Sequence, residues 1–299
     1  MAMLDTLNAG STNPIWKDYL TLTKPRVVAV LVLTSMVGML LARPVLPPID
    51  LFILANLGIG LAASAAAAVN HVVDRRLDAM MSRTKHRPVS EGKVSPTNAL
   101  VFAFALGLTG LAILVMVANV LTAVLTFASI IGYAVVYTLY LKRATPQNIV
   151  IGGIAGASPP LLGWVAVTGS VDPNALLLVA IIFAWTPPHF WALCIAKKDD
   201  YANADIPMLP VTHGEDYTRL QMLLYTILMV IVTVLPYLNG MSGVVYLIGI
   251  VIINARFLML LKRYTDSKDA QDAMTLFWYS IRYIMWLFLF LLVDHFVLL

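Results

Sequence analysis

The sequence predicts an all-α integral membrane protein, with about nine transmembrane helices around a central cavity that is open to the cytoplasmic side. Three observations lead to this fold class. Of the 299 residues, 60% are hydrophobic and 12% are charged, so the bilayer must take up apolar side chains that a soluble core could not hold. Apolar runs of membrane-spanning length recur along the chain. Almost all Lys and Arg residues fall in the segments of one side.

Each apolar run reaches the roughly 20 residues that a helix needs to cross the hydrocarbon core. Residues 1–24 precede the runs as a polar N-terminal cytoplasmic segment that lacks the apolar centre of a signal peptide. Residues 25–299 then form a single transmembrane domain, with long loops at 71–96 and 197–217. Within this domain the predicted spans are 25–43, 50–70, 97–118, 120–141, 147–168, 174–196, 218–238, 242–261 and 276–297.

The distribution of basic residues predicts how these spans are oriented. Of the 20 Lys and Arg residues, only Arg43 lies on the side of the short turns, and Arg282 lies inside the last span near the opposite side. The positive-inside rule therefore places the N-terminus and both long loops in the cytoplasm and the C-terminus outside the inner membrane of the cell. Orientation alone accounts for these cations, so the net charge of +4 identifies no anionic partner, and no nucleic acid is expected to bind.

The acidic residues at the end of the second span are not needed for orientation. Asn70, Asp74 and Asp78 are spaced by four, which stacks them about 6 Å apart on one face of a helix. Oxygen ligands without His or Cys suit Mg²⁺, which commonly shares its coordination shell with phosphates. Donors for phosphate oxygens follow directly in the sequence, at Arg83, Lys85 and Arg87. The pattern predicts a metal-bridged diphosphate; the alternative is a helix end whose Asp and Arg residues pair with one another.

Two further segments carry candidate functional groups on the same side of the membrane. The loop "KKDDYANADIPMLPVTHGED" (197–216) supplies carboxylates at Asp199, Asp200 and Asp205. His189, in "WTPPHFW", lies near the cytoplasmic end of the sixth span, and an ionisable residue at such a place is a functional candidate. It is either a buried imidazole that hydrogen-bonds a neighbouring helix or, as a common ligand of haem iron, a residue that binds haem.

These motifs resemble a known family. The segment "NHVVDRRLD" (70–78) is similar to the Asn-x-x-x-Asp-x-x-x-Asp motif of the UbiA-type intramembrane prenyltransferases, which also have nine helices. Four stretches resemble the branch of that family that farnesylates haem, and the resemblance extends from about residue 24 to residue 282. The stretches are "SRTKHRPVSEGKVSP" (82–96), "LKRATPQNIVIGGIAGASPPLLGWVAVTG" (141–169), "WTPPHFWALCIAKKDDY" (185–201) and "IPMLPVTHG" (206–214).

The resemblance implies that farnesyl diphosphate, haem b and water react to give haem O and diphosphate, within the lipid bilayer. It implies a haem A synthase or a terminal oxidase assembly as the recipient of the product. It also implies a role for each candidate residue. Mg²⁺ and catalysis are assigned to Asn70, Asp74, Asp78 and Asp200, the diphosphate to Arg83, Lys85 and Arg87, and haem to His189. The loop at 197–217 departs from the second acidic motif, Asp-x-x-x-Asp. In this sequence Ala204, not Asp, stands four positions after Asp200.

Two other functions remain open at the level of the sequence. An aromatic prenyltransferase that acts on a quinone precursor would need the same acidic motif. A transporter of anionic solutes would instead show polar or broken helices near the middle of the bilayer, whereas the charges here gather at one side. The glycine-rich stretch also has two interpretations, because Gly152 and Gly156 either allow close helix packing or leave volume for bulky substrates.

Overall fold

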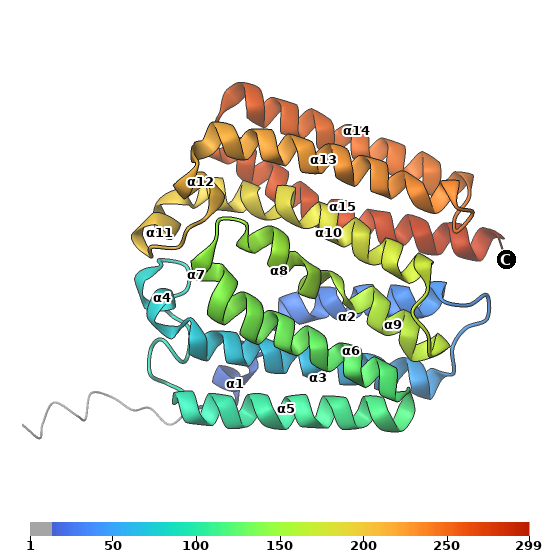
Figure 1. Ribbon diagram of the computed structural model, residues 1–299, viewed down its shortest axis with the longest axis horizontal. Coiled ribbons are helices and arrows are strands. Elements are labelled where there is room, and N and C mark those ends of the chain that lie inside the picture. The colour runs from blue at the N-terminus through green and yellow to red at the C-terminus, as the bar shows by residue number, and fades with distance from the viewer. Residues whose placement is uncertain (1–13, 299) are drawn as a thin grey trace, which may run out of the picture.

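A computed structural model that describes residues 14–298 shows a bundle of helices, with no strand in that range (Figure 1). Residues 1–13 of the predicted N-terminal segment lie outside the described residues. The helices are α1 (Trp16–Leu22), α2 (Pro25–Leu41), α3 (Ile49–Val73), α4 (Arg75–Met80), α5 (Pro96–Val117), α6 (Val120–Ile131), the π-helix η2 (Gly132–Leu141), α7 (Lys142–Ala144), α8 (Asn148–Ala157), α9 (Pro159–Thr168), α10 (Pro173–Ala196), α11 (Lys198–Asn203), α12 (Leu209–Thr212), α13 (Gly214–Leu238), α14 (Val244–Ser267) and α15 (Ala270–Leu298).

The predicted spans are confirmed. Within residues 14–298, eight helical segments are long and apolar enough to cross a membrane, and a ninth is completed if α1 and α2, bent by 51° to each other, count as one span. Two of these spans are composite, since α6, η2 and α7 follow one another directly and α8 joins α9. Helices α13 and α15 begin earlier than predicted, because each carries a polar first turn that hydropathy alone assigns to the loop.

Local sequence signals explain where several helices begin. Helix α5 starts with Pro96, whose missing N–H is no loss in a first turn, and the Ser95 hydroxyl accepts a hydrogen bond from the backbone N–H of Asn98 at 3.1 Å. The start of α10 repeats this arrangement, with Pro173 in the first turn and the Asp172 carboxylate as the cap. These starts agree with the predicted spans to within one residue.

Helix–helix packing sets the frame around the site. Helix α3 packs against α2 and α5, and α10 packs against α8, α13 and α15. Helices α2 and α9 approach at backbone distance: a Cβ atom at Gly38 would overlap the Pro160 carbonyl, and one at Gly163 would overlap the Ser35 carbonyl. Only glycine fits at these two positions, which is a common device for close helix contact in membranes.

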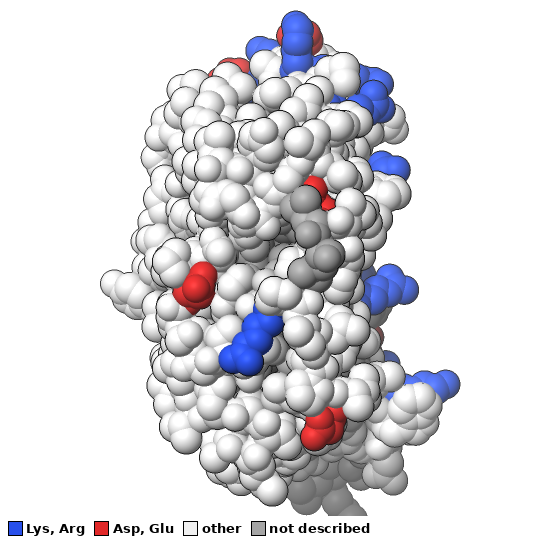
Figure 2. All heavy atoms as spheres, turned by 90° about the vertical axis from the view of Figure 1, so that its right-hand side faces the viewer, with Lys and Arg blue, Asp and Glu red and all other residues white. Residues whose placement is uncertain are grey.

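The two ends of the bundle differ in character. The segments around α4 and around α11 and α12 meet at one end, called the loop end below, while the C-terminus lies at the other (Figure 1). Figure 2 views the end opposite the loop end, and Lys and Arg are sparse over it. The two long loops therefore lie at the same end of the bundle, as predicted.

Candidate active site

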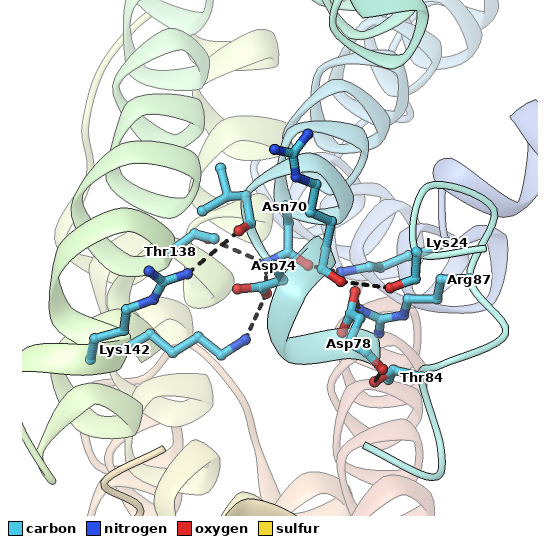
Figure 3. Close-up of polar contacts among 12 residues, drawn as sticks. Lys24, Asn70, Asp74, Asp78, Thr84, Arg87, Thr138 and Lys142 are labelled. Atoms are coloured by element: carbon cyan, nitrogen blue, oxygen red, sulfur yellow. Dashed lines mark hydrogen bonds and ion pairs between the residues drawn. The ribbon is translucent and has the colours of Figure 1, made fainter. Parts of the chain in front are cut away.

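The acidic motif spans a break between two helices. Helix α3 ends at Val73 and α4 begins at Arg75, with Asp74 between them at ψ 0°. The helix on which the three residues were expected to share a face is therefore interrupted at Asp74 alone. Helical hydrogen bonds still bridge the break, from the Asp74 N–H to the Asn70 carbonyl at 2.9 Å and from the Asp78 N–H to the Asp74 carbonyl at 2.8 Å. The spacing of the motif is thus kept, and Asn70 contacts Asp74 directly (Figure 3).

Cationic side chains from distant segments surround the first two motif residues. Asn70 and Asp74 are 4% and 1% exposed. One carboxylate oxygen of Asp74, Oδ2, accepts hydrogen bonds from the Asn70 amide at 2.7 Å and from the Lys142 ammonium at 2.6 Å. The Lys24 ammonium donates to the amide oxygen of Asn70. The second carboxylate oxygen of Asp74 is buried and has no hydrogen-bond partner among the described residues.

The third motif residue has a cationic partner of its own. Asp78 is buried, and the Nη1 atom of Arg87 lies 2.8 Å from each of its carboxylate oxygens (Figure 3). The hydroxyl of Thr84 donates to the Asp78 backbone carbonyl at 3.2 Å. Of the three predicted diphosphate ligands, only Arg87 therefore reaches the acidic motif. Arg83 and Lys85 are exposed at the loop end.

The π-helix η2 delivers two of the groups around Asn70. Its residue Thr138 is fully buried and accepts a long hydrogen bond from the Asn70 amide at 3.4 Å, while its hydroxyl donates to the Tyr133 carbonyl at 2.7 Å. Lys142 follows η2 directly, as the first residue of α7. Segments of π-helix occur preferentially at functional sites, and here the segment ends where Lys142 meets Asp74.

The second acidic loop contacts the first. The Ser82 hydroxyl lies 2.8 and 3.0 Å from the two carboxylate oxygens of Asp200. Burial raises the pKa of the neighbouring Tyr201 hydroxyl well above its usual range, and the nearby guanidinium of Arg83 partly offsets this effect. Asp199 and Asp205 are exposed. Asp200 is thus the carboxylate of this loop that touches the first loop, which supports its choice over the other two.

An apolar cavity of about 160 Å³ begins beside the charged cluster. Lys24 lines it at the loop end, and small residues of α3, such as Ala63 and Ala67, form one wall. Gly156 forms part of another wall, and a Cβ atom there would meet nothing within 4 Å. At Gly152, by contrast, a Cβ atom would overlap the Tyr137 ring. One glycine of the pair therefore serves packing and the other leaves open volume.

The residues of the motif can hold a divalent cation only after rearrangement. No three His, Cys, Asp or Glu side chains in the described part of the chain are placed to share one ion, and Lys142 and Arg87 occupy Asp74 and Asp78. The unpartnered oxygen of Asp74 nevertheless fits such an ion, since it is a buried hard donor without a proton partner. The donor set therefore fits Mg²⁺, provided that the two cationic side chains move away.

His189 lies in a separate environment, between α10 and α15. Its Nδ1 atom is 2.6 Å from the hydroxyl of Ser280, and its ring stacks between those of Trp185 and Phe277. The predicted hydrogen bond to a neighbouring helix is thus present. Within residues 14–298, no hydrogen bond or ion pair joins His189 to the charged cluster around Asp74.

Sequence reasoning missed Lys24 and Lys142 as members of the cluster and assigned both to membrane orientation. In the sequence, a lysine that orients a span looks the same as one that neutralises a buried carboxylate. The only available signal was the position of each lysine at the loop end of a span, which most other lysines share.

Together, the fold and the site define a multi-pass membrane protein whose buried charged cluster leads into an apolar cavity. The UbiA prenyltransferase family matches residues 31–281, and the chain belongs to this family. It is therefore a membrane-embedded prenyltransferase. A relative from Saccharophagus degradans, named protoheme IX farnesyltransferase, is 59% identical over 283 residues, which cover 95% of this chain and 93% of the relative.

Solved structures share the fold at low sequence identity. A digeranylgeranylglyceryl phosphate synthase superposes with a TM-score of 0.79 at 18% identity, over 94% of this chain and 98% of its own. A UbiA homologue from Archaeoglobus fulgidus, solved with DMAPP and Mg²⁺, gives a TM-score of 0.62 at 16% identity, over 92% and 99% of the two chains. These likenesses establish the UbiA-type helical fold.

Proposed function

We propose that this prenyltransferase transfers the farnesyl group of farnesyl diphosphate to a vinyl group of haem b, with addition of water, and releases haem O and diphosphate. The name of the 59% identical relative supports this pair of substrates. The observation that carries the proposal is the polarity of the site. Cations at the loop end lead through Lys24 into an apolar cavity, and a prenyl diphosphate has the same polarity, charged at one end and apolar along the rest.

The charged end of the substrate is bound by the buried cations. Lys142 and Arg87 are paired with Asp74 and Asp78, whereas Lys24 donates to the Asn70 amide oxygen and has no carboxylate partner among the described residues. A diphosphate that enters brings the missing negative charge and many acceptor oxygens. The exposed side chains Arg83 and Lys85 lie at the rim of the same end, where they attract the diphosphate before it binds.

Mg²⁺, bound through Asn70, Asp74, Asp78 and Asp200, would neutralise the charge that develops on the leaving diphosphate. With the carboxylates on such an ion, the N–H groups of Lys142 and Arg87, which now bind Asp74 and Asp78, would be free to bind phosphate oxygens. The Ser82 hydroxyl keeps the Asp200 carboxylate beside the first loop. The likeness to a homologue solved with Mg²⁺ and DMAPP supports this use of a divalent ion.

The chemistry then needs a dry pocket more than a protein nucleophile. The bond between the first farnesyl carbon and the diphosphate oxygen breaks, and its electron pair leaves with the diphosphate. The vinyl π-bond of haem b attacks the allylic carbon, and water captures the cation that remains beside the macrocycle and then loses a proton. The cavity is lined mostly by apolar side chains, such as Val28, Leu31 and Ala67, which would exclude bulk water from the allylic cation.

We also propose that His189 binds the haem iron, which a half-buried imidazole beside α15 is equipped to do.

Residues 25–299 act as a single domain of the inner membrane, with residues 1–24 and both long loops in the cytoplasm and the C-terminus outside. The excess of Lys and Arg at the loop end supports this orientation. Haem O, still hydrophobic, passes to a haem A synthase or to an assembling terminal oxidase.

The direct test is anaerobic incubation of the purified enzyme in lipid with haem b, farnesyl diphosphate and Mg²⁺, followed by mass analysis of the haem. We expect a product heavier than haem b by one farnesyl group and one hydroxyl group, formed together with diphosphate. Prenylation of a quinone precursor but not of haem would overturn the proposal in favour of an aromatic prenyltransferase. Uptake of an anionic solute into proteoliposomes, without diphosphate release, would indicate a transporter.

A further inference from the structure

The imidazole of His189 is held on three sides. Trp185 stacks on the ring at a centroid distance of 4.2 Å and Phe277 at 4.8 Å, with interplanar angles of 15° and 20°. The Nδ1 edge lies 2.6 Å from the Ser280 hydroxyl oxygen. The Trp185 indole N–H also donates to α15, at the Ser280 carbonyl, at 2.9 Å. Both ring faces and one edge are therefore covered, and only the edge that carries Nε2 remains.

The hydrogen bonds of Ser280 determine which ring nitrogen carries the proton. Its hydroxyl oxygen is 2.6 Å from the Phe277 carbonyl oxygen and 2.6 Å from His189 Nδ1. A hydroxyl has one proton to donate, and a carbonyl can only accept. The Ser280 proton must therefore lie toward Phe277. The short contact to His189 then requires a proton on Nδ1, because two lone pairs would otherwise face each other at 2.6 Å.

This proton count leaves Nε2 as a free acceptor. No hydrogen bond to His189 Nε2 occurs within residues 14–298, and none of the carboxylates in that range forms an ion pair with the ring. Partial burial without a partner anion disfavours a charged imidazolium. The ring is thus neutral, with a lone pair on Nε2 that lies in the ring plane. Histidines that bind metals usually donate their other N–H to a fixed acceptor in this way.

We infer that Ser280 is a positioning residue for the haem substrate: it holds His189 as the Nδ1–H tautomer, so that Nε2 can ligate the haem iron. The inference rests on the proposed function, because it takes haem as the second substrate. The stacked rings fix the plane of the imidazole, and Ser280 fixes its rotation within that plane. Ser280 itself, fully buried on α15, does not touch the haem.

The test compares two porphyrins that differ only in the metal. Wild type and Ser280→Ala, in lipid nanodiscs, are titrated with ferric haem b and with metal-free protoporphyrin IX. Loss of a supporting hydrogen bond to a metal-binding histidine typically weakens metal affinity by about 10-fold or more. We expect Ser280→Ala to bind haem about 10-fold more weakly, with an altered Soret band, and to bind the metal-free porphyrin as wild type does.

Controls separate this role from packing. Ser280→Thr keeps the hydroxyl and should restore haem affinity and spectrum. Thr226→Val removes another buried hydroxyl that is bound to its own helix, at the Met222 carbonyl on α13, and should change neither titration. A Ser280→Ala enzyme that melts at lower temperature but binds both porphyrins as wild type does would overturn the inference. Equal losses for both porphyrins would also overturn it, because the iron would then play no part.

A measurement on the wild type avoids dependence on the folding of the variants. Side-chain ¹⁵N NMR of histidine-labelled enzyme, with His189 assigned by its absence in His189→Ala, should show a protonated Nδ1 and a bare Nε2. The reverse tautomer would refute the inference. Its failure is distinguishable from failure of the proposed function: wild type that still converts haem b to haem O keeps the function and loses only the role of Ser280. Wild type that neither binds nor converts haem refutes both.

Discussion

Replacing Asp74 with Asn removes one negative charge from the most enclosed carboxylate of the site and leaves its shape almost unchanged. Asp74 is 1% exposed and receives hydrogen bonds from Asn70 at 2.7 Å and from Lys142 at 2.6 Å. The amide oxygen of the substituted Asn can still accept both bonds. The substitution also leaves the Lys142 ammonium, 15% exposed, without its counter-charge, so we expect a loss of about 3 kcal/mol in the free energy of unfolding, the lower end for a broken buried ion pair.

The expected kinetic loss is a separate effect, measured below the melting temperature of the variant. An oriented group that stabilises the charge developing in a transition state contributes about 100- to 1,000-fold in rate, or about 3–4 kcal/mol. Asp74→Asn should therefore reduce haem farnesylation by at least about 100-fold, while the protein still inserts and melts at a lower temperature. Anaerobic product formation, followed by mass analysis, and a thermal melt in the same detergent measure the two effects.

Asp205→Asn is the matched control for Asp74→Asn, because it makes the same chemical change at an exposed position of the second loop. We expect it to retain nearly all activity. A rate for Asp74→Asn within a few-fold of wild type would refute the assignment of this carboxylate to catalysis. An equally damaging Asp205→Asn would show that the second motif is centred on the wrong carboxylate.

Two further predictions concern the cations and the glycines. Arg87→Lys keeps a cation for Asp78 but loses the planar guanidinium, so the KM for farnesyl diphosphate should rise by about 10-fold. Arg83→Lys, at an exposed position, should raise this KM less. Unchanged steady-state kinetics in both variants would mean that both arginines serve only to orient the chain in the membrane. Gly163→Ala should destabilise the protein by about 1–3 kcal/mol in a thermal melt, because its Cβ atom would overlap a backbone carbonyl of α2. Gly156→Ala should melt at or above the wild-type temperature, because its Cβ atom would meet nothing within 4 Å.

The spans could be predicted from the sequence because bilayer thickness sets the length of an apolar helix. All nine predicted spans overlap observed helices, and the largest errors lie in polar end turns. Helix α13 begins with Glu215 and Asp216 in its first turn, and α14 continues to Ser267 beyond its apolar run. The π-helix η2 could not be predicted, since its apolar residues also suit an ordinary α-helix. Its consequence for the site, the placement of Thr138 beside Asn70, was therefore missed as well.

The sequence predicted the acidic motif of the site but not the cationic side chains that bind it. The spacing of Asn70, Asp74 and Asp78 gives helical contacts directly, because it involves neighbours along one segment. The partners of these residues depend on how distant helices pack, and no local pattern encodes that. Asp200 lies between these cases: the sequence offers three carboxylates in its loop, and the contact with Ser82 singles out one of them.

The origin of the buried cations bears on the two interpretations of the acidic motif. A helix end that pairs its own charges uses nearby arginines, and Asp78 does so with Arg87 of the same loop, whereas the adjacent Arg75 and Arg76 are exposed. Asp74 is instead bound by Lys142, which is 68 residues away in the sequence, and Asn70 by Lys24, 46 residues away. Carboxylates buried in a low-dielectric bundle need a counter-charge at all times. Cations on other helices supply that charge in the absence of a ligand and can later turn to a diphosphate without unfolding the motif.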